Sequence, residues 1–493
     1  MAASEPTYGN WRSPTSPGVG ALGLLGTLIV LGGMLLAIVT MLFSPLLGLL
    51  VVLTSAVMVT PLLFRDRRGR NPLQNVAALL AWRWARRSGW HLYRAGPLSL
   101  IANGTCRLPG LAAASHLYEA RDSYDRKFAM LVVPATGHYS AVFECSADGA
   151  GLVDSDQIDT WVAYWGQWLA GLGAEPSLVA ASVTVETAPD SGTRLGREVS
   201  TQLAADAPAL ARRVLSEVVA TYPAGSAQVS TRIALTYSAT PPSGGKRRTT
   251  EQMARELGTR LPGLSTGLQM TGAGAARPMT AVQLAEAIRV AYDPEALALI
   301  EQANQAGGSQ LAWHEAGPAG HEERWDHYLH DSGASITWAM SQAPRGEVYA
   351  NVLTGLISPH RDIVRKRVTL LYRPHDAGAA ATIVERDKKD ARFKITGANV
   401  AARDAVAVAA AEQTAREEAR GAGVTRFALL LTATVRSVDD LSLAAAAIDT
   451  LAPAARLQLR RCRGQAAAFA AALPLGLVVP AHLQVPQSVR DAM

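Results

Sequence analysis

The residues with the greatest potential for chemistry are histidines and carboxylates that gather in one short stretch. Four of the ten histidines fall within 17 residues, in a stretch that holds His314, Glu315, His321, Glu322, Glu323, Asp326, His327, His330 and Asp331. On a helix, His327 and His330 would share a face, and imidazole and carboxylate groups are common ligands of divalent metals. Nothing in the sequence fixes a ligand geometry, however. A solvated loop is the favoured interpretation, and a metal site that serves a membrane-tethered enzyme is the alternative.

Motifs of nucleotide-dependent and hydrolytic enzymes are missing from the sequence. A phosphate-binding P-loop needs GxxxxGK followed by Ser or Thr, but Gly245-Lys246 is followed by Arg247, and Thr240 stands where the first glycine belongs. No GxSxG or HExxH pattern occurs either. We therefore expect a protein that is not an enzyme, with no catalytic residues and no bound cofactor or metal.

The elements that must position any site begin with a long apolar segment. Between Arg12 and Arg65 the chain has 52 consecutive residues without a charge, whereas one membrane span needs about 20. Proline is tolerated in the first turn of a helix but not inside one, so Pro45 favours a break there. The sequence thus predicts a transmembrane hairpin with spans near 20–41 and 46–63.

Small residues recur in the first predicted span. Gly20, Gly23 and Gly26, with Gly32 and Gly33 farther on, predict a face that lets two helices approach closely in lipid. Mere flexibility of the chain before the span is the alternative explanation for the first glycines.

Positive charge is concentrated directly after the second span. From residue 65 to 94 one aspartate stands against eight arginines, a net charge of +7, while the whole chain carries +6; these arginines are Arg65, Arg67, Arg68, Arg70, Arg83, Arg86, Arg87 and Arg94. Such a strip favours the cytoplasmic side, which predicts a multi-pass protein of the inner or plasma membrane with both termini and the bulk of the chain in the cytoplasm. A cleaved signal peptide is disfavoured, because its basic region would precede the apolar core.

An amphipathic helix is expected after the strip begins. Pro72 suits a first helical turn, and Trp82, Trp84 and Trp90 alternate with arginines in a way typical of the headgroup region of a bilayer. Packing on the soluble part of the protein is the alternative for this helix. Outside the strip the charge is nearly neutral, so we expect no sequence-specific binding of nucleic acid.

The remaining chain alternates between strand-like and helical patterns. Strands are predicted at 128–133, 138–145, 178–187, 227–238, 335–340, 367–372, 426–435 and 457–461. Helices are predicted at 158–172, around Pro208 up to 222, and at 249–268, 279–291, 294–305, 347–356, 377–420, 438–451 and 465–473, with an interruption near Gly397. Three cysteines, far apart and without CxxC spacing, argue against a disulfide framework and for a reducing compartment.

These patterns specify an α/β (α+β) fold in which the membrane hairpin is followed by two ferredoxin-like α/β sandwich units of similar architecture. The expected domains are a cytoplasmic tail at 1–16, the hairpin at 17–64, a basic amphipathic segment at 65–105, a first α/β domain at 106–245, a helical connecting region at 246–330 and a second α/β domain at 331–493.

Several short motifs resemble one family. They are Tyr8-Gly9-Asn10-Trp11-Arg12, Arg65-Asp66-Arg67-Arg68-Gly69-Arg70, Trp90-His91-Leu92-Tyr93-Arg94-Ala95-Gly96-Pro97, Cys106-Arg107-Leu108-Pro109-Gly110, Pro134-Ala135-Thr136-Gly137-His138-Tyr139 and Asp159-Thr160-Trp161-Val162-Ala163. Together with the hairpin, they resemble actinobacterial integral membrane proteins of conjugation-type secretion clusters. The soluble part, with Gln465 to Gly476 at its end, is similar in layout to the non-motor region of type IV secretion ATPases.

The resemblance implies a membrane-anchored scaffold of a conjugative, type IV-like secretion apparatus. Its partners would be the lipid bilayer, a separate motor ATPase and other membrane subunits, in an oligomeric assembly. An accessory subunit of a type VII-like translocon is the alternative, since such subunits also combine two N-terminal spans with a cytoplasmic α/β domain.

Overall fold

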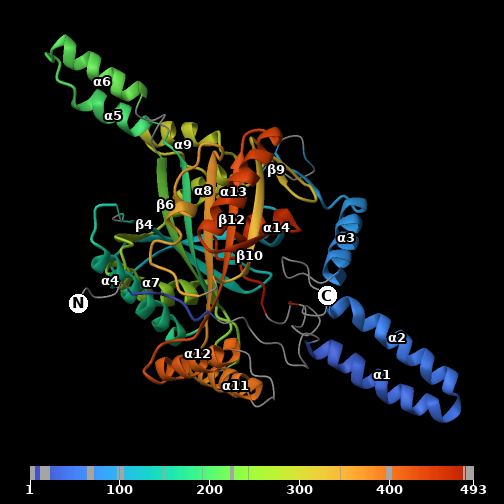
Figure 1. Ribbon diagram of the computed structural model, residues 1–493. Coiled ribbons are helices and arrows are strands. Elements are labelled where there is room, and N and C mark those ends of the chain that lie inside the picture. The colour runs from blue at the N-terminus through green and yellow to red at the C-terminus, as the bar shows by residue number, and fades with distance from the viewer. Residues whose placement is uncertain are drawn as a thin grey trace.

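The protein is a mixed α/β structure with one antiparallel sheet of 13 strands and an N-terminal pair of helices, α1 and α2 (Figure 1). The computed structural model describes residues 6–11, 23–63, 72–96, 99, 105–147, 149, 151–190, 192–221, 227–242, 244–344, 346–395, 402–480 and 484.

The described helices follow one another along the chain as α1 (Gly23–Phe43), α2 (Pro45–Leu63), α3 (Pro72–Arg87), α4 (Ser155–Gly171), α5 (Thr193–Gln202), α6 (Ala209–Thr221), α7 (Thr250–Gln269), α8 (Ala281–Tyr292), α9 (Ala296–Gln305), α10 (Thr354–Ile357), α11 (Ala377–Ile395), α12 (Ala402–Ala419), α13 (Leu441–Ala454) and α14 (Gln465–Ala471). The strands are β1 (Leu92–Arg94), β2 (His116–Arg121), β3 (Lys127–Val133), β4 (His138–Ser146), β5 (Leu178–Pro189), β6 (Ala227–Ser238), β7 (Ala275–Pro278), β8 (Gly320–Glu323), β9 (Tyr328–His330), β10 (Gly333–Gln342), β11 (Arg365–Pro374), β12 (Thr425–Val435) and β13 (Gln458–Arg461).

The two halves of the sheet repeat one connectivity. In the first half the chain runs β4-α4-β5-β6-α7-β7 and the spatial order is β7-β4-β6-β5; in the second half it runs β10-α10-β11-β12-α13-β13 with the order β13-β10-β12-β11. Along the chain, a helical hairpin separates the second and third of these strands in each half: α5–α6 between β5 and β6, and α11–α12 between β11 and β12. Both hairpins project from the sheet (Figure 1). The connectivity of the second half thus matches that of the first.

The halves do not form separate sheets. Strands β5 and β11 pair antiparallel, with Thr184 opposite Thr369 at the centre of the pairing and their hydroxyl oxygens 3.2 Å apart. Equivalent hydroxyl pairs lie inside each half, Ser140 with Thr236 at 2.9 Å and Ser335 with Thr434 at 2.7 Å. Each half thus covers the edge strand of the other, which removes two long unpaired edges.

Helices cover the sheet on both faces. On one face, α4 and α7 cover the first half around Phe128, and α10 and α13 cover the second half around Trp338. On the other face, α8 and Phe469 of α14 share one apolar cluster. Both α7 and α8 begin with a capping box, in which a threonine and a glutamine three residues later satisfy free N–H groups of the first turn.

The centre of the second face is polar but closed. Arg365 and Arg367 form ion pairs with the buried Glu186, and burial alone would raise the pKa of Glu186, yet the Arg367 and Arg365 guanidinium groups hold it at about 2. The residues after α14 cover this face: Thr369 donates to the carbonyl of Ala472 and Thr236 to that of Gly476. The predicted closing segment from Gln465 to Gly476 therefore seals the middle of the sheet.

Most predicted elements are present, and the differences concern short segments. The break before Pro45 and every predicted strand are found. The predicted helix at 347–356 is reduced to the short α10, and the region 246–330, expected to be a helical connection, also supplies β7, β8 and β9 to the sheet. The interruption near Gly397 lies outside the described residues.

Candidate membrane-proximal site

Helices α1 and α2 project away from the sheet (Figure 1). Many of their apolar side chains are exposed. Leu35 is 68% exposed and Phe43 84% exposed, which would be unfavourable in water for so many large side chains together. The stretch Gly26–Phe43 is long and apolar enough to cross a membrane, and an N-terminal signal sequence has the same features. Helix α2 adds a shorter apolar stretch, Pro45–Thr60.

Small residues lie at the contact between these two helices. Gly26 and Ala37 are buried, and a Cβ atom built on Gly33 would lie 2.3 Å from the hydroxyl oxygen of Ser55 on α2. Gly32, in contrast, faces open space. Gly23 is the first residue of α1, and Gly20 lies outside the described residues.

The segment before α1 binds to the α/β body. Tyr8 pairs with Val348 through two backbone hydrogen bonds of 2.8 Å, and its hydroxyl donates to Asp159 of α4 at 2.8 Å. Asn10 donates to Thr414 of α12, and the ring of Trp11 lies edge-on to Phe427 at 6.4 Å. The motifs at 8–12 and 159–163, far apart in the sequence, thus contact each other through Tyr8 and Asp159.

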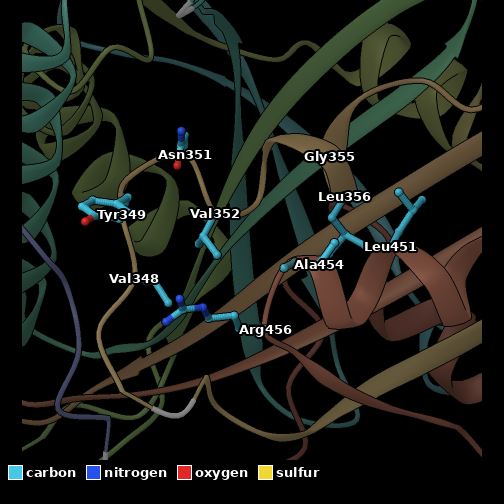
Figure 2. A pocket seen from close by; sticks show the side chains of 10 residues that line it. Val348, Tyr349, Asn351, Val352, Gly355, Leu356, Leu451, Ala454 and Arg456 are labelled. Atoms are coloured by element: carbon cyan, nitrogen blue, oxygen red, sulfur yellow. The ribbon is translucent and has the colours of Figure 1, made fainter.

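A small cavity lies beside this contact. Its volume is about 320 Å³, and apolar side chains such as Leu356 and Leu451 line it together with Arg456 (Figure 2). Arg456 donates to the carbonyl of Glu347 at 2.6 Å, next to the residue that pairs with Tyr8. The cavity therefore belongs to the region that holds the N-terminal segment.

After α2, helix α3 packs on the body along one side. Trp82 lies edge-on to Trp325 with ring centres 5.5 Å apart, and the Arg86 guanidinium lies 5.4 Å from the centre of the Trp82 ring. The chain then enters β1, which pairs with β8 and so becomes an edge strand of the sheet. Packing on the soluble body, the alternative considered for this helix, is thus present.

The other side of α3 remains exposed and apolar. On this side, Leu73, Leu80 and Trp84 are 38–58% exposed, and Trp90 is 68% exposed with its ring centre 4.5 Å from that of Trp84. Arg83, Arg86 and Arg87 are exposed as well. The helix therefore presents tryptophan and arginine side chains together; Arg65, Arg67, Arg68 and Arg70 lie outside the described residues.

From His321 to His330 the histidine-rich stretch forms a strand pair, β8 with β9, and not the predicted solvated loop or a helix, whereas His314 and Glu315 are exposed in a short 3-10 turn before it. His321 in β8 is the direct cross-strand partner of His330 in β9, and both are buried in an aromatic cluster with Tyr328. His330 hydrogen bonds to the carbonyl of Tyr292 and, at 2.7 Å, to the hydroxyl of Ser335. Burial lowers the pKa of both histidines to about 4, so they are neutral at pH 7.

The acidic members of that stretch have other partners. Asp326 lies 2.8 Å from His327, Asp331 pairs with Arg289 at 3.2 Å, and Glu323 accepts a hydrogen bond from the backbone of Ala466. Among the described residues, no three His, Cys, Asp or Glu side chains are grouped so that they could hold a metal ion.

The sequence did not lead us to the residues of the α/β body that face α3. Trp325, Arg461 and Arg463 were not singled out, although Arg463 lies 4.3 Å from the centre of the Trp325 ring and Arg461 is 5.9 Å from that of Trp338. A tryptophan two residues after Glu323, and three arginines within four residues near the C-terminus, were the available signals.

Comparison with known families covers only this part of the chain. Residues 15–74 match a family described as Domain of unknown function (DUF8461), a range that contains α1, α2 and the first residues of α3. No curated protein matches the chain.

Proposed function

We propose that the chain is a membrane-anchored scaffold of a conjugative, type IV-like secretion apparatus and that it docks a separate motor ATPase at the cytoplasmic face. The anchoring part of this proposal rests on one observation: the segment before α1 and the helix after α2 both bind the same α/β body. An antiparallel helix pair held at both ends by one body returns the chain to its starting side of a bilayer.

The same observation favours a two-span hairpin over a signal peptide. Cleavage after an N-terminal signal would remove Tyr8 and Asn10, together with their hydrogen bonds to Asp159 and Thr414. The arginine strip after α2 then favours the plasma membrane, with both termini and the body in the cytoplasm.

The α/β body suits a structural role. We interpret the β-α-β-β-α-β connectivity of each half as a ferredoxin-like unit, so that two such units share one sheet. The scaffold role, the motor partner and the oligomeric assembly come from the resemblance of the sequence motifs. Direct sequence-specific contact with nucleic acid is not part of the proposal, because the positive charge lies in the membrane-proximal strip.

Affinity purification of the full chain in mild detergent, followed by mass spectrometry of the bound proteins, tests this function. A conjugation-type motor ATPase in stoichiometric amount is the expected result. Recovery of a type VII motor would instead support an accessory subunit of a type VII-like translocon. Bound metal in stoichiometric amount without any motor would instead support a function as a membrane-tethered metal-dependent enzyme.

A further inference from the structure

A cavity of about 700 Å³ lies between α3 and the edge of the second half of the sheet. Val76 and Leu79 of α3 form part of one wall, and Trp325 and Trp338 contribute aromatic surface. Three arginines, Arg460, Arg461 and Arg463, line the cavity on the side of the body. The cavity therefore joins an apolar surface to a cluster of positive charges.

The carboxylates in the lining do not neutralise this cluster. Asp326 and Asp449 stand against three arginines, and the closest approach between Asp326 and Arg461 is 3.9 Å. Asp326 makes its shorter contact with His327, at 2.8 Å. Arg463 is fixed over the Trp325 ring and donates to the carbonyl of Trp325 at 3.2 Å, whereas Arg460 and Arg461 are half-buried at the edge strand β13. Of the three, Arg460 and Arg461 are thus the arginines left to approach an anion in the cavity.

The position of the cavity indicates which kind of anion it would bind. Its α3 wall begins at Asn75, about a dozen residues after the end of the apolar helix α2, and the exposed side of α3 carries Leu80 and Trp84. If α1 and α2 span a bilayer, as the proposed function requires, the cavity lies at the level of the lipid headgroups. A phospholipid matches both surfaces, with its phosphate at the arginines and the upper part of an acyl chain against Val76 and Leu79.

We propose that this cavity binds one anionic phospholipid of the bilayer, with Arg460 and Arg461 as the ligands of its phosphate. The site differs from the arginine strip of residues 65–94, because its charges come from the second half of the sheet. It rests on the membrane anchoring within the proposed function and adds a specific lipid class to it. A bound lipid would hold α3 and β13 together, and so couple the membrane helices to the body.

Native mass spectrometry of the full chain, released from nanodiscs of phosphatidylcholine with or without phosphatidylglycerol, tests the site. We expect one retained phosphatidylglycerol per chain and a weaker, unsaturated signal for phosphatidylcholine. Since each arginine near a bilayer surface contributes roughly 1 kcal/mol of attraction, the double variant R460Q/R461Q should bind phosphatidylglycerol about 30-fold more weakly.

The matched control removes two arginine charges at a distant part of the surface. Arg386 and Arg420 are exposed at the α11–α12 hairpin, so R386Q/R420Q should bind as the unaltered chain does. The single variant R460Q tests the same ligand without disturbing the contact between Arg461 and Trp338, and thermal unfolding in phosphatidylcholine nanodiscs confirms that each variant is folded.

Three outcomes overturn the assignment: equal retention of both lipids, unchanged binding by R460Q and by R460Q/R461Q, or displacement of the lipid by millimolar inorganic phosphate, which would indicate a site for free phosphate. Failure here is separable from failure of the proposed function. Loss of lipid preference with a motor ATPase still bound removes only the lipid site, while retained lipid without any motor removes only the scaffold role.

Discussion

At the scale of single residues, the packing of α1 on α2 depends on one close approach. Gly33 leaves no room for a side chain beside Ser55, but its neighbour Gly32 faces open space. Overpacking a well-packed contact costs about 1–3 kcal/mol. We expect Gly33→Val to lower the stability of the helix pair by that amount, measured by unfolding in mixed micelles of mild detergent and SDS.

Gly32→Val is the matched control, since it adds the same side chain one position away. It should leave the unfolding midpoint nearly unchanged. Equal effects of the two substitutions would show that helix propensity, and not packing of α1 on α2, determines the result.

Two buried histidines make stability depend on pH. The pKa of His330 is lowered to about 4 in the folded protein, against about 6.5 in an unfolded chain, so its contribution is fully present above about pH 6.5 and is lost as the pH falls toward 4. Between pH 7 and pH 5 the loss is about 2 kcal/mol, and His321 adds a similar effect. Denaturant unfolding of the full chain in detergent at both pH values measures it.

His330→Gln should reduce this pH dependence, because glutamine keeps a donor and an acceptor but does not titrate in this range. The control is His314→Gln, since His314 is exposed. An unfolding free energy that is equal at pH 7 and pH 5 in the unaltered chain would contradict the burial of neutral histidines.

At the scale of elements, the arginines around α3 should orient the protein and not retain it. Each attracts anionic headgroups by about 1 kcal/mol, a term that salt weakens, whereas burial of the apolar helices is insensitive to salt. Changing Arg67, Arg68, Arg86 and Arg87 to Gln should leave the protein in the membrane after a high-salt wash but weaken binding of the motor subunit or disturb the topology. Membrane fractionation and co-purification measure the two effects.

Either of two results would be incompatible with that role. Release of the variant by salt would mean that α1 and α2 do not anchor the chain. Full retention, unchanged topology and unchanged transfer of cargo would mean that the arginines are only a solvated flank.

At the scale of the whole molecule, the segments at both ends of the α1–α2 pair bind the same α/β body. Both ends of the pair must therefore lie on one side of any bilayer that the pair crosses. We expect the body to be inaccessible from outside the cell. A cysteine introduced at the exposed Thr240, in a background without Cys106, Cys145 and Cys462, should resist a membrane-impermeant thiol reagent in intact cells.

Ser44, between α1 and α2, provides the opposite control. A cysteine there should react from outside, because the proposed two-span hairpin would place it on the far side of the bilayer. Labelling at Thr240→Cys in intact cells would indicate a topology opposite to the proposed one. Protection at both sites would argue against a bilayer-spanning pair.

The sequence alone determined the local features of this protein. The long run without charge, the proline that opens α2, the arginines that follow it and the alternation of strands and helices all depend on neighbouring residues, so they could be predicted. Short polar strands such as β8 and β9 escaped prediction because the paired strands and aromatic neighbours that stabilise them are distant in the chain.

Only the tertiary structure decided how those features meet. The pairing of β5 with β11 joins edges nearly 200 residues apart, and the contacts of Tyr8 with Asp159 and of Trp82 with Trp325 join the membrane-proximal segments to the body. No local signal specifies such contacts, because they follow from the complementary edges and surfaces of elements that are already formed. The cavity lined by Arg460 and Arg461 arises in the same way, between a helix next to the membrane segment and a strand near the C-terminus.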